Sequence, residues 1–132
     1  MADQKVRILL VDDHMIVRKG LACIINAQDD MEIISEASDG QDAIEQARQY
    51  RPQVVIMDVR MPILDGIKAT RIIRSDSPKT QIIGLSMCAR EEEGEEMRKA
   101  GAIDYLSKNG PTDAILAAIR RAAAQSQARE LV

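Results

Sequence analysis

Short runs of apolar residues alternate along the chain with longer segments in which apolar residues recur every three or four positions. The runs are rich in Val, Ile and Leu and are typical of strands buried in a sheet, whereas the longer segments have the spacing of amphipathic helices. The expected strands cover about residues 6–11, 31–36, 54–58, 81–86 and 102–106. The expected helices cover about residues 15–27, 40–50, 66–77, 90–100 and 111–124, the last opened by Pro111.

This strict alternation predicts an α/β fold, a three-layer α/β/α sandwich with a five-stranded parallel sheet and right-handed crossovers. We expect the flavodoxin-like strand order 2-1-3-4-5, which places the ends of the first and third strands side by side at a topological switch point. A length of 132 residues fits one domain. We expect this domain to cover residues 1–124, and residues 125–132, where the apolar period is lost, to begin a linker or tail.

Two of the expected helices have unusual surfaces. The fourth is mostly charged and contains Gly94, which costs about 1 kcal/mol relative to Ala in a helix. We therefore predict that it is the least firmly held helix. The fifth carries Ala117, Ala118 and Ala122, which we interpret as a flat face able to dimerise or to dock a partner.

Composition narrows the functional classes. The net charge of −3 argues against direct nucleic-acid binding and against attraction to an anionic membrane. With two Tyr and neither Trp nor Phe, the core must be aliphatic. Cys23 and Cys88 lack metal-ligand spacing, and Cys23 lies in an apolar helical pattern that predicts burial. No signal peptide or long apolar span is present, so we expect a cytoplasmic protein.

Acidic residues close two of the expected strands. Asp58 ends the third strand, and Asp12 and Asp13 follow the first, so the strand order would bring all three together. Carboxylates a few ångströms apart repel by about 3 kcal/mol per pair at an effective dielectric constant of about 20. Protonation or a hard divalent cation relieves this repulsion, and Mg²⁺ suits a site with few carboxylates. Taken alone, Asp12 and Asp13 could equally cap the first helix; the third acid favours a metal site.

A hydroxyl and an ammonium group close two later strands at the same edge. Ser86 follows the fourth strand and Lys108 the fifth. Considered alone, Ser86 would be interpreted as an ordinary loop residue and Lys108 as an ordinary surface residue. Beside three acids, they supply the hydrogen bonds and positive charge that the oxygens of an arriving phosphoryl group require.

The complete pattern covers about residues 5–124. It resembles the receiver domain of two-component response regulators, a family with a chemotaxis-regulator-like fold. The residues that carry the resemblance are Asp12-Asp13, Asp58, Met61-Pro62-x-x-Asp65-Gly66, Ser86, and Lys108 with Tyr105 three positions before it. Further details resemble the branch that joins a receiver to a helix-turn-helix DNA-binding domain, namely Asp13-His14, Ser86-Met87 and Lys108-Asn109-Gly110.

The resemblance implies a role for each acid. Asp58 would accept a phosphoryl group from a sensor histidine kinase or from acetyl phosphate. Asp13 and Asp58 would bind Mg²⁺ directly, together with the backbone carbonyl of Arg60, while Asp12 would act mainly through water. The neighbouring His14 we interpret as a helix-start residue at the rim of the cleft.

The resemblance also implies a switch. Ser86 and Lys108 would hold the phosphoryl oxygens, and movement of Ser86 would let Tyr105 rotate inward. The face formed by the fourth helix, fifth strand and fifth helix would then repack. This face would control an output domain or partner protein, most simply for transcription regulation, or form a homodimer. No direct nucleic-acid or membrane contact is implied for this domain.

Three residues near the cleft occupy positions that tune the family's chemistry. Arg60 and Cys88 stand two residues after Asp58 and Ser86, where the family sets the rate of phosphate hydrolysis, and Met87 could narrow access. We expect the Arg60 side chain to shield the aspartyl phosphate. Many relatives have proline after the lysine where this chain has Asn109, which leaves the geometry of that peptide bond open.

Other functions remain as alternatives. The chain could be a single-domain regulator or the receiver of a hybrid kinase, or a docking module that has lost phosphorylation, although no acid is missing. A phosphatase of the haloacid-dehalogenase type would need a second Asp two residues after the nucleophile, where Arg60 stands. Flavin binding would need a Ser/Thr-rich loop and aromatic residues. We therefore expect no enzyme beyond one that catalyses its own phosphorylation and dephosphorylation.

Overall fold

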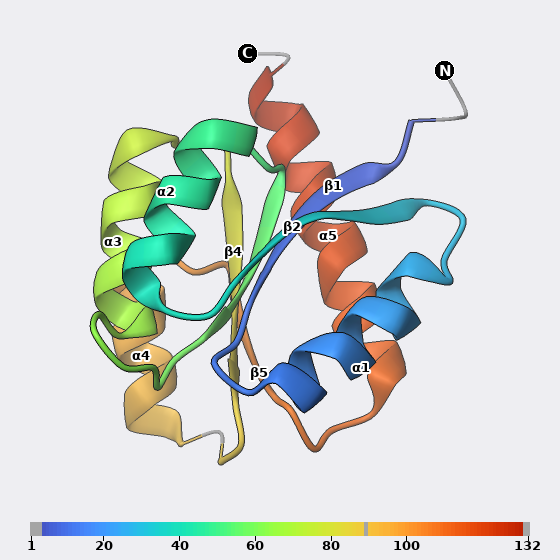
Figure 1. The fold of residues 1–132 in the computed structure, drawn as a ribbon. Coiled ribbons are helices and arrows are strands. Elements are labelled where there is room, and N and C mark those ends of the chain that lie inside the picture. The colour runs from blue at the N-terminus through green and yellow to red at the C-terminus, as the bar shows by residue number, and fades with distance from the viewer. Residues whose placement is uncertain (1–3, 89, 131–132) are drawn as a thin grey trace.

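The computed structural model describes residues 4–88 and 90–130, in which five strands and five helices alternate strictly (Figure 1). The strands are β1 (Val6–Val11), β2 (Met31–Ala37), β3 (Val54–Asp58), β4 (Gln81–Ser86) and β5 (Asp104–Ser107). The helices are α1 (Met15–Asn26), α2 (Gly40–Tyr50), α3 (Gly66–Asp76), α4 (Glu91–Ala100) and α5 (Thr112–Glu130). The predicted α/β class is confirmed.

The strands form one parallel sheet in the predicted order, β2-β1-β3-β4-β5. In the pairing of β1 with β3, Val11 lies opposite Met57. The residues that follow these two, Asp12 and Asp58, therefore leave the sheet side by side. The pairing of β4 with β5 places Ser86 opposite Ser107, directly before Lys108. Register alone thus gathers four of the predicted site residues at the carboxyl edge.

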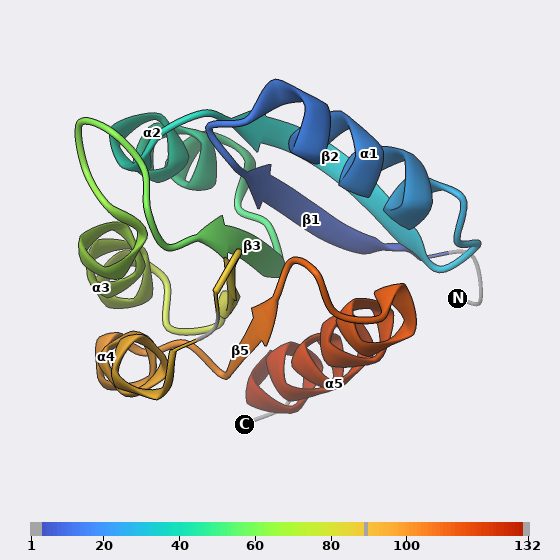
Figure 2. The same cartoon turned by 90° about the horizontal axis from the view of Figure 1, so that it is seen from below.

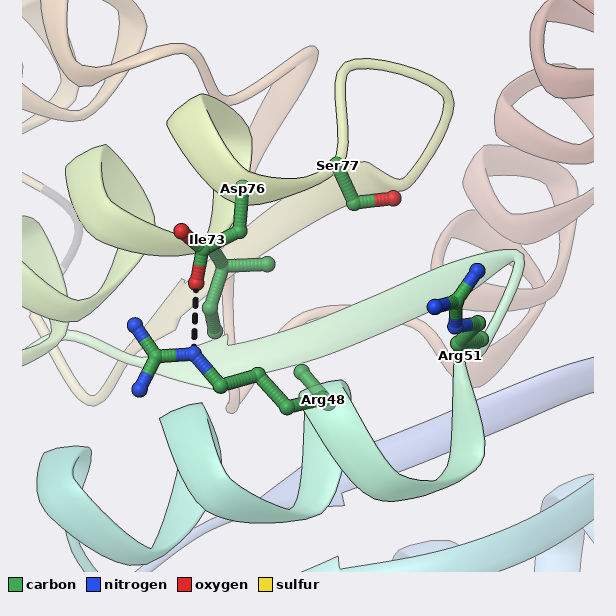
Figure 3. Close-up of a pocket in the computed structure, with 6 residues that line it drawn as sticks. Arg48, Arg51, Ile73, Asp76 and Ser77 are labelled. Carbon is green, nitrogen blue, oxygen red and sulfur yellow. Dashed lines mark hydrogen bonds and ion pairs between the residues drawn. The ribbon is translucent and has the colours of Figure 1, made fainter.

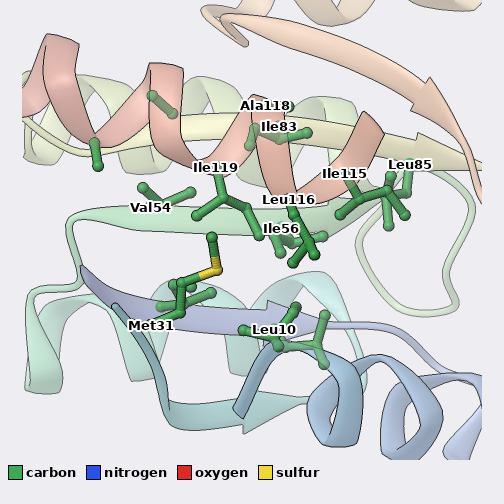
Figure 4. Close-up of a cluster of buried hydrophobic side chains, with 14 of the residues drawn as sticks. Leu10, Met31, Val54, Ile56, Ile83, Leu85, Ile115, Leu116, Ala118 and Ile119 are labelled. Atoms are coloured by element: carbon green, nitrogen blue, oxygen red, sulfur yellow. The ribbon is translucent and has the colours of Figure 1, made fainter. Parts of the chain in front are cut away.

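Helices cover both faces of the sheet, as Figure 2 shows from the side of the carboxyl edge. Helices α1 and α5 pack on one face, and α2, α3 and α4 on the other. Because β3 lies in the middle of the sheet, all five of its residues are buried, as its apolar pattern predicts. On the α5 side, aliphatic side chains fill the core, among them Leu10, Val54, Ile56, Ile83, Ile115, Leu116 and Ile119 (Figure 4).

The turn after β3 is fixed by a capped helix and a close backbone approach. Asp65 caps α3 as expected, because its Oδ1 accepts a hydrogen bond of 2.9 Å from the Lys68 N–H. A Cβ at Gly66 would lie 2.1 Å from the Asp58 carbonyl oxygen, so only glycine permits this approach. The loop is thereby held against the end of the strand that carries Asp58.

β5, α4 and α5 each begin one or two residues later than predicted. β5 begins at Asp104 instead of residue 102, because the chain leaving α4 is still closing that helix. Gly101 has a φ of 117°, and the Ala102 N–H donates to the Met97 carbonyl at 2.9 Å. Helix α5 begins one residue after Pro111, whose carbonyl accepts from the Ala114 N–H.

The C-terminal helix is longer than expected. Helix α5 continues to Glu130, past residue 125 where the predicted tail begins, and Ser126 is buried. Residues 131 and 132, the end of that tail, lie outside the described residues. That residues 125–132 lead into a linker stays a prediction.

Two predictions about exposure are wrong. Ala118 and Ala122 are 1% and 0% exposed because they pack against the sheet, so of the three alanines only Ala117 faces solvent. Cys23 is exposed although its pattern suggested burial, since its neighbours Ala22 and Ile25 are the buried residues of α1. The outer surface of α5 is therefore not a flat alanine face.

Candidate functional site

Three acidic side chains meet where β1 and β3 end. Side-chain ligand atoms of Asp12, Asp13, His14 and Asp58 all lie within 4.8 Å of one another. Asp12 and Asp58 are 1% and 4% exposed, whereas the Asp13 side chain is partly open to solvent. The structure thus brings together the three carboxylates that the strand order predicts.

Lys108 reaches into this cluster from the end of β5. Its Nζ lies 2.8 Å from Asp12 Oδ2 and 3.1 Å from Asp58 Oδ2, and its side chain is 4% exposed. Burial by itself lowers the pKa of the Lys108 ammonium, but the two carboxylates outweigh burial and raise it. We call Asp12, Asp13, Asp58 and Lys108 the acidic cleft.

Within the acidic cleft, the Asp58 carboxyl has a strongly raised pKa. Burial raises its pKa to about 6; the nearby Lys108 opposes this shift, and Asp12 and Asp13 add to it. A carboxylate is therefore held here at a cost in free energy, which is common where a side chain has a chemical task.

The acidic cleft has the donor set of a site for a hard cation. Three buried carboxylate oxygens, Asp12 Oδ2, Asp13 Oδ1 and Asp58 Oδ2, have no hydrogen bond among the described residues. Lys108 supplies a single positive charge to two of them. Three converging carboxylates with a single ammonium group between them suit a divalent cation such as Mg²⁺, which takes oxygen ligands and relieves the repulsion.

His14 lies at the rim, as expected. It is the N-cap residue of α1 and its side chain is 64% exposed, with Nδ1 3.1 Å from Asp13 Oδ1. Its backbone N–H donates to Asp12 Oδ1 at 2.9 Å. Asp12 therefore closes the turn before α1, but it does not cap that helix, because the N-cap residue is His14.

A pocket of about 230 Å³ opens onto Asp58. It contains most of the predicted site residues that lie outside the acidic cleft. The lining side chains are His14, Asp58, Arg60, Ser86, Met87, Cys88, Arg90 and Lys108.

A second pocket, of about 200 Å³, lies at the opposite edge of the sheet between α2 and α3 (Figure 3). Arg48 Nε and Asp76 Oδ2 form an ion pair of 2.8 Å there. None of the predicted site residues lines this second pocket, so the candidate site is the one at Asp58.

Sequence reasoning missed Glu93, which links three site residues. Ser86 Oγ and the Tyr105 hydroxyl donate to Glu93 Oε1 at 3.2 and 2.6 Å, and Arg60 Nε donates to Glu93 Oε2 at 2.9 Å. Burial raises the pKa of the Glu93 carboxyl, but these donors outweigh burial and lower it. We call Glu93 with Ser86, Tyr105 and Arg60 the Glu93 cluster.

The sequence does contain a signal for Glu93. It precedes Met97 by four residues and Ala100 by seven, so it shares the face of α4 that packs on the sheet. A carboxylate on an inward face needs polar partners. This reasoning distinguishes Glu93 from the exposed Glu91 and Glu92 beside it.

The three predicted tuning residues lie at the mouth of the pocket. The Arg60 side chain is 71% exposed and turned toward Glu93, while its backbone N–H donates to Asp58 Oδ1 at 3.4 Å. Met87 is 56% exposed, and the Cys88 N–H donates to Ser86 Oγ at 3.3 Å. No peptide bond among the described residues is cis, so the Lys108–Asn109 bond is trans.

Comparison with known proteins gives one consistent picture. Residues 8–120 match the response regulator receiver domain family. The chain is 43% identical over 123 residues to the uncharacterized transcriptional regulatory protein YxjL of Bacillus subtilis strain 168, covering 93% of this chain and 56% of YxjL. It is 39% identical over 115 residues to the oxygen regulatory protein NreC of Staphylococcus epidermidis, covering 86% of this chain and 53% of NreC.

Solved structures of response regulators have the same fold as this chain. A LuxR-family two-component response regulator from Aurantimonas sp. SI85-9A1 superposes with a TM-score of 0.87 at 32% identity, covering 92% of this chain and 86% of that one. The response regulator domain of CheB from Thermotoga maritima gives a TM-score of 0.85 at 33% identity, covering 91% and 97%. The chain spans about half the length of the curated relatives it matches. No helix in the described part of the chain is long and apolar enough to cross a membrane.

Proposed function

Because the chain belongs to the response regulator receiver family and is similar to LuxR-type members, we propose that Asp58 accepts a phosphoryl group and thereby switches the protein between two signalling states. One observation carries the proposal above all. Asp58 is a buried carboxylate at the end of the central strand, facing a pocket together with Lys108 and Ser86. Such a group is both a nucleophile and surrounded by the charges that phosphoryl transfer requires.

The transfer step follows from this placement. One Asp58 carboxylate oxygen attacks the phosphorus of a phosphohistidine, forming an acyl phosphate while the P–N bond breaks. The electron pair of that bond leaves with the imidazole nitrogen, which then takes up a proton. Lys108, 3.1 Å from Asp58 Oδ2, neutralises charge on the transferring group, and Ser86 donates a hydrogen bond to it.

Oxygen ligands for Mg²⁺ come from this chain's own residues. Asp13 and Asp58 would bind it directly with the Arg60 carbonyl, and Asp12 through water. Bound there, the cation would offset the carboxylate repulsion and the negative charge of the phosphoryl oxygens. Support comes from the three carboxylate oxygens that lack hydrogen bonds among the described residues.

The partners follow from the same chemistry. A sensor histidine kinase would supply the phosphoryl group, which would place the protein in the cytoplasm with the kinase's ATP. The face of α4, β5 and α5 would carry the signal to an output domain, for which transcription regulation is favoured by the transcriptional regulatory protein YxjL among the relatives. The same face would serve a homodimer.

We propose no catalysis on a separate substrate. The chain would catalyse only its own phosphorylation and dephosphorylation, because one nucleophile without a neighbouring second acid/base favours a lasting acyl phosphate over turnover. Steady release of phosphate from an unrelated phosphate ester would contradict this.

The test of the proposed function is labelling with acetyl phosphate and Mg²⁺, followed by mass spectrometry of the intact chain. We expect the mass of one phosphoryl group to be added and mapped to Asp58. Asp58→Asn should abolish labelling, whereas Asp29→Asn, a matched change at an exposed residue, should leave it intact. Labelling that persists in Asp58→Asn would refute the assignment.

A further inference from the structure

We propose that Glu93 is a positioning residue that holds the unphosphorylated state, by occupying the donors that the phosphoryl group must recruit. The inference rests on the proposed function of Asp58. It starts from the Glu93 cluster, in which donors from three separate segments converge on one carboxylate. These segments are the loop after β3, the end of β4, and β5, so Glu93 ties α4 to each of them.

Glu93 and a phosphoryl group on Asp58 would compete for the Ser86 hydroxyl. A serine hydroxyl has one proton to donate. Ser86 Oγ divides it between Glu93 Oε1 at 3.2 Å and the Cys88 carbonyl at 3.1 Å. A phosphoryl group on Asp58 would bring strong acceptor oxygens and additional negative charge into the same pocket. Ser86 cannot serve it without leaving Glu93.

The exposed Arg60 side chain is also engaged by Glu93. Its guanidinium is bound to Glu93 Oε2, although Arg60 itself lines the pocket at Asp58. A phosphoryl group attracts this guanidinium and repels the Glu93 carboxylate. Two of the three bonds to Glu93 are therefore weakened by the same event.

Tyr105 is the third residue that Glu93 holds. Its hydroxyl is bound to Glu93 Oε1, and its ring lies against Gly94, where a Cβ would come within 2.8 Å of Tyr105 Cδ2. Glycine at this helical position therefore gives the ring its place. When Glu93 loses Ser86 and Arg60, the hydrogen bond that holds the Tyr105 hydroxyl at α4 remains alone, and both the ring and α4 are free to shift.

The first measurement tests the contact without any phosphoryl chemistry. In a Tyr50→Phe background Tyr105 is the only tyrosine of the chain, and ultraviolet absorbance reports the titration of its phenol. Burial and Glu93 raise the pKa of Tyr105. Glu93→Gln should lower it toward the ordinary value of about 10, because the amide carries no charge. Glu92→Gln, the same change at an exposed neighbour, should not.

The second measurement tests whether Glu93 holds the unphosphorylated state. Affinity for beryllofluoride with Mg²⁺, and the rate of labelling by acetyl phosphate, should each rise about 5-fold in Glu93→Gln, the ratio that corresponds to one hydrogen bond of ordinary net strength. The amide nitrogen would face Arg60 Nε, donor against donor, so that contact is lost. Glu92→Gln should leave both quantities unchanged.

The outcomes separate the two proposals. Failure of the wild-type chain to bind beryllofluoride would overturn the function of Asp58, while the Tyr105 titration would still decide whether Glu93 holds the ring. If the wild-type chain binds beryllofluoride normally and Glu93→Gln shows no gain in affinity or labelling rate, only the proposed role of Glu93 is overturned. Glu93→Ala serves as a second variant if Glu93→Gln does not fold. An unchanged affinity of Glu93→Ala for beryllofluoride would equally overturn the proposed role of Glu93.

Discussion

The acidic cleft and the Glu93 cluster are neighbouring carboxylate sites built on opposite principles. In the cleft, two of the three carboxylates share one lysine, and three carboxylate oxygens lack hydrogen bonds among the described residues. In the Glu93 cluster, one carboxylate receives three donors. Burial raises the pKa of Asp58 to about 6, whereas the donors lower that of Glu93. The cleft is therefore poised for an incoming group, and the Glu93 cluster is satisfied as it stands.

The largest expected effect comes from removing the cation of the cleft. Lys108→Ala should slow labelling of Asp58 by acetyl phosphate by about 100-fold or more, the usual loss when one preorganised donor to a developing charge is deleted. The measurement is the initial rate of labelling at saturating Mg²⁺. Lys68→Ala, a matched change at an exposed lysine, should leave the rate intact. An equal rate in both variants would show that the cleft does not depend on its single cation.

The next effect tests whether the cleft stores repulsion. Because the folded pKa of Asp58 is raised from 3.8 to about 6, its carboxyl favours folding below pH 4 and that contribution is lost as pH rises through 6. Without metal, Asp58→Asn should therefore stabilise the chain at pH 7 by up to about 3 kcal/mol, at about 1.36 kcal/mol per pKa unit. Urea unfolding with a chelator measures the difference.

Two conditions provide the controls for this stability difference. At pH 4 the difference between Asp58→Asn and wild type should shrink, because the folded carboxyl is then protonated in the wild-type chain. Added Mg²⁺ should stabilise the wild-type chain more than the variant. A variant less stable than wild type at pH 7 would mean that the Lys108 contact outweighs burial and repulsion.

These two regions also show how far the sequence alone leads. The cleft was predictable because each of its residues directly follows an apolar strand, and parallel strands end at one edge. Asp12, Asp58 and Lys108 need only strand order and register to meet, and both follow from the strict alternation of elements. The position of Ser86 was predictable for the same reason, because it ends β4 at the same edge of the sheet.

The Glu93 cluster was not predictable in the same way, because it depends on the rotation of a helix. α4 carries five glutamates, and the choice of Glu93 requires knowing which turn faces the sheet. The burial of Ala118 and Ala122 was predictable, because these residues follow the buried Ile115 by three and seven positions and so share its face of α5. The length of α5 was missed because helix propensity continues where the apolar period stops.

A smaller effect tests whether the Glu93 cluster needs the room that Gly94 leaves. Gly94→Ala gains helix propensity of up to about 1 kcal/mol, but its Cβ would stand 2.8 Å from Tyr105 Cδ2, and overpacking costs about 1–3 kcal/mol. We expect a net loss of about 1 kcal/mol in thermal or urea unfolding.

Gly20→Ala is the matched control for Gly94→Ala. A Cβ at Gly20, in α1, would meet nothing within 4 Å, so this variant should gain up to about 1 kcal/mol from helix propensity alone. If both glycine variants were stabilised equally, the Tyr105 ring would not be confined by α4. The Glu93 cluster would then be a looser assembly than its hydrogen bonds indicate.

The smallest effect concerns Arg60, the residue that can serve either region. The Arg60 side chain in the ion pair with Glu93 is 71% exposed, so Arg60→Ala should change the free energy of unfolding only slightly. If the guanidinium moves to shield the aspartyl phosphate, the same variant should shorten the half-life of phosphorylated Asp58 a few-fold. The measurement is the decay of label after the phosphodonor is removed, with Arg71→Ala, at an exposed position of α3, as control. A half-life equal to that of the control would assign Arg60 to the Glu93 cluster alone, because a cation that never leaves Glu93 cannot exclude water from Asp58.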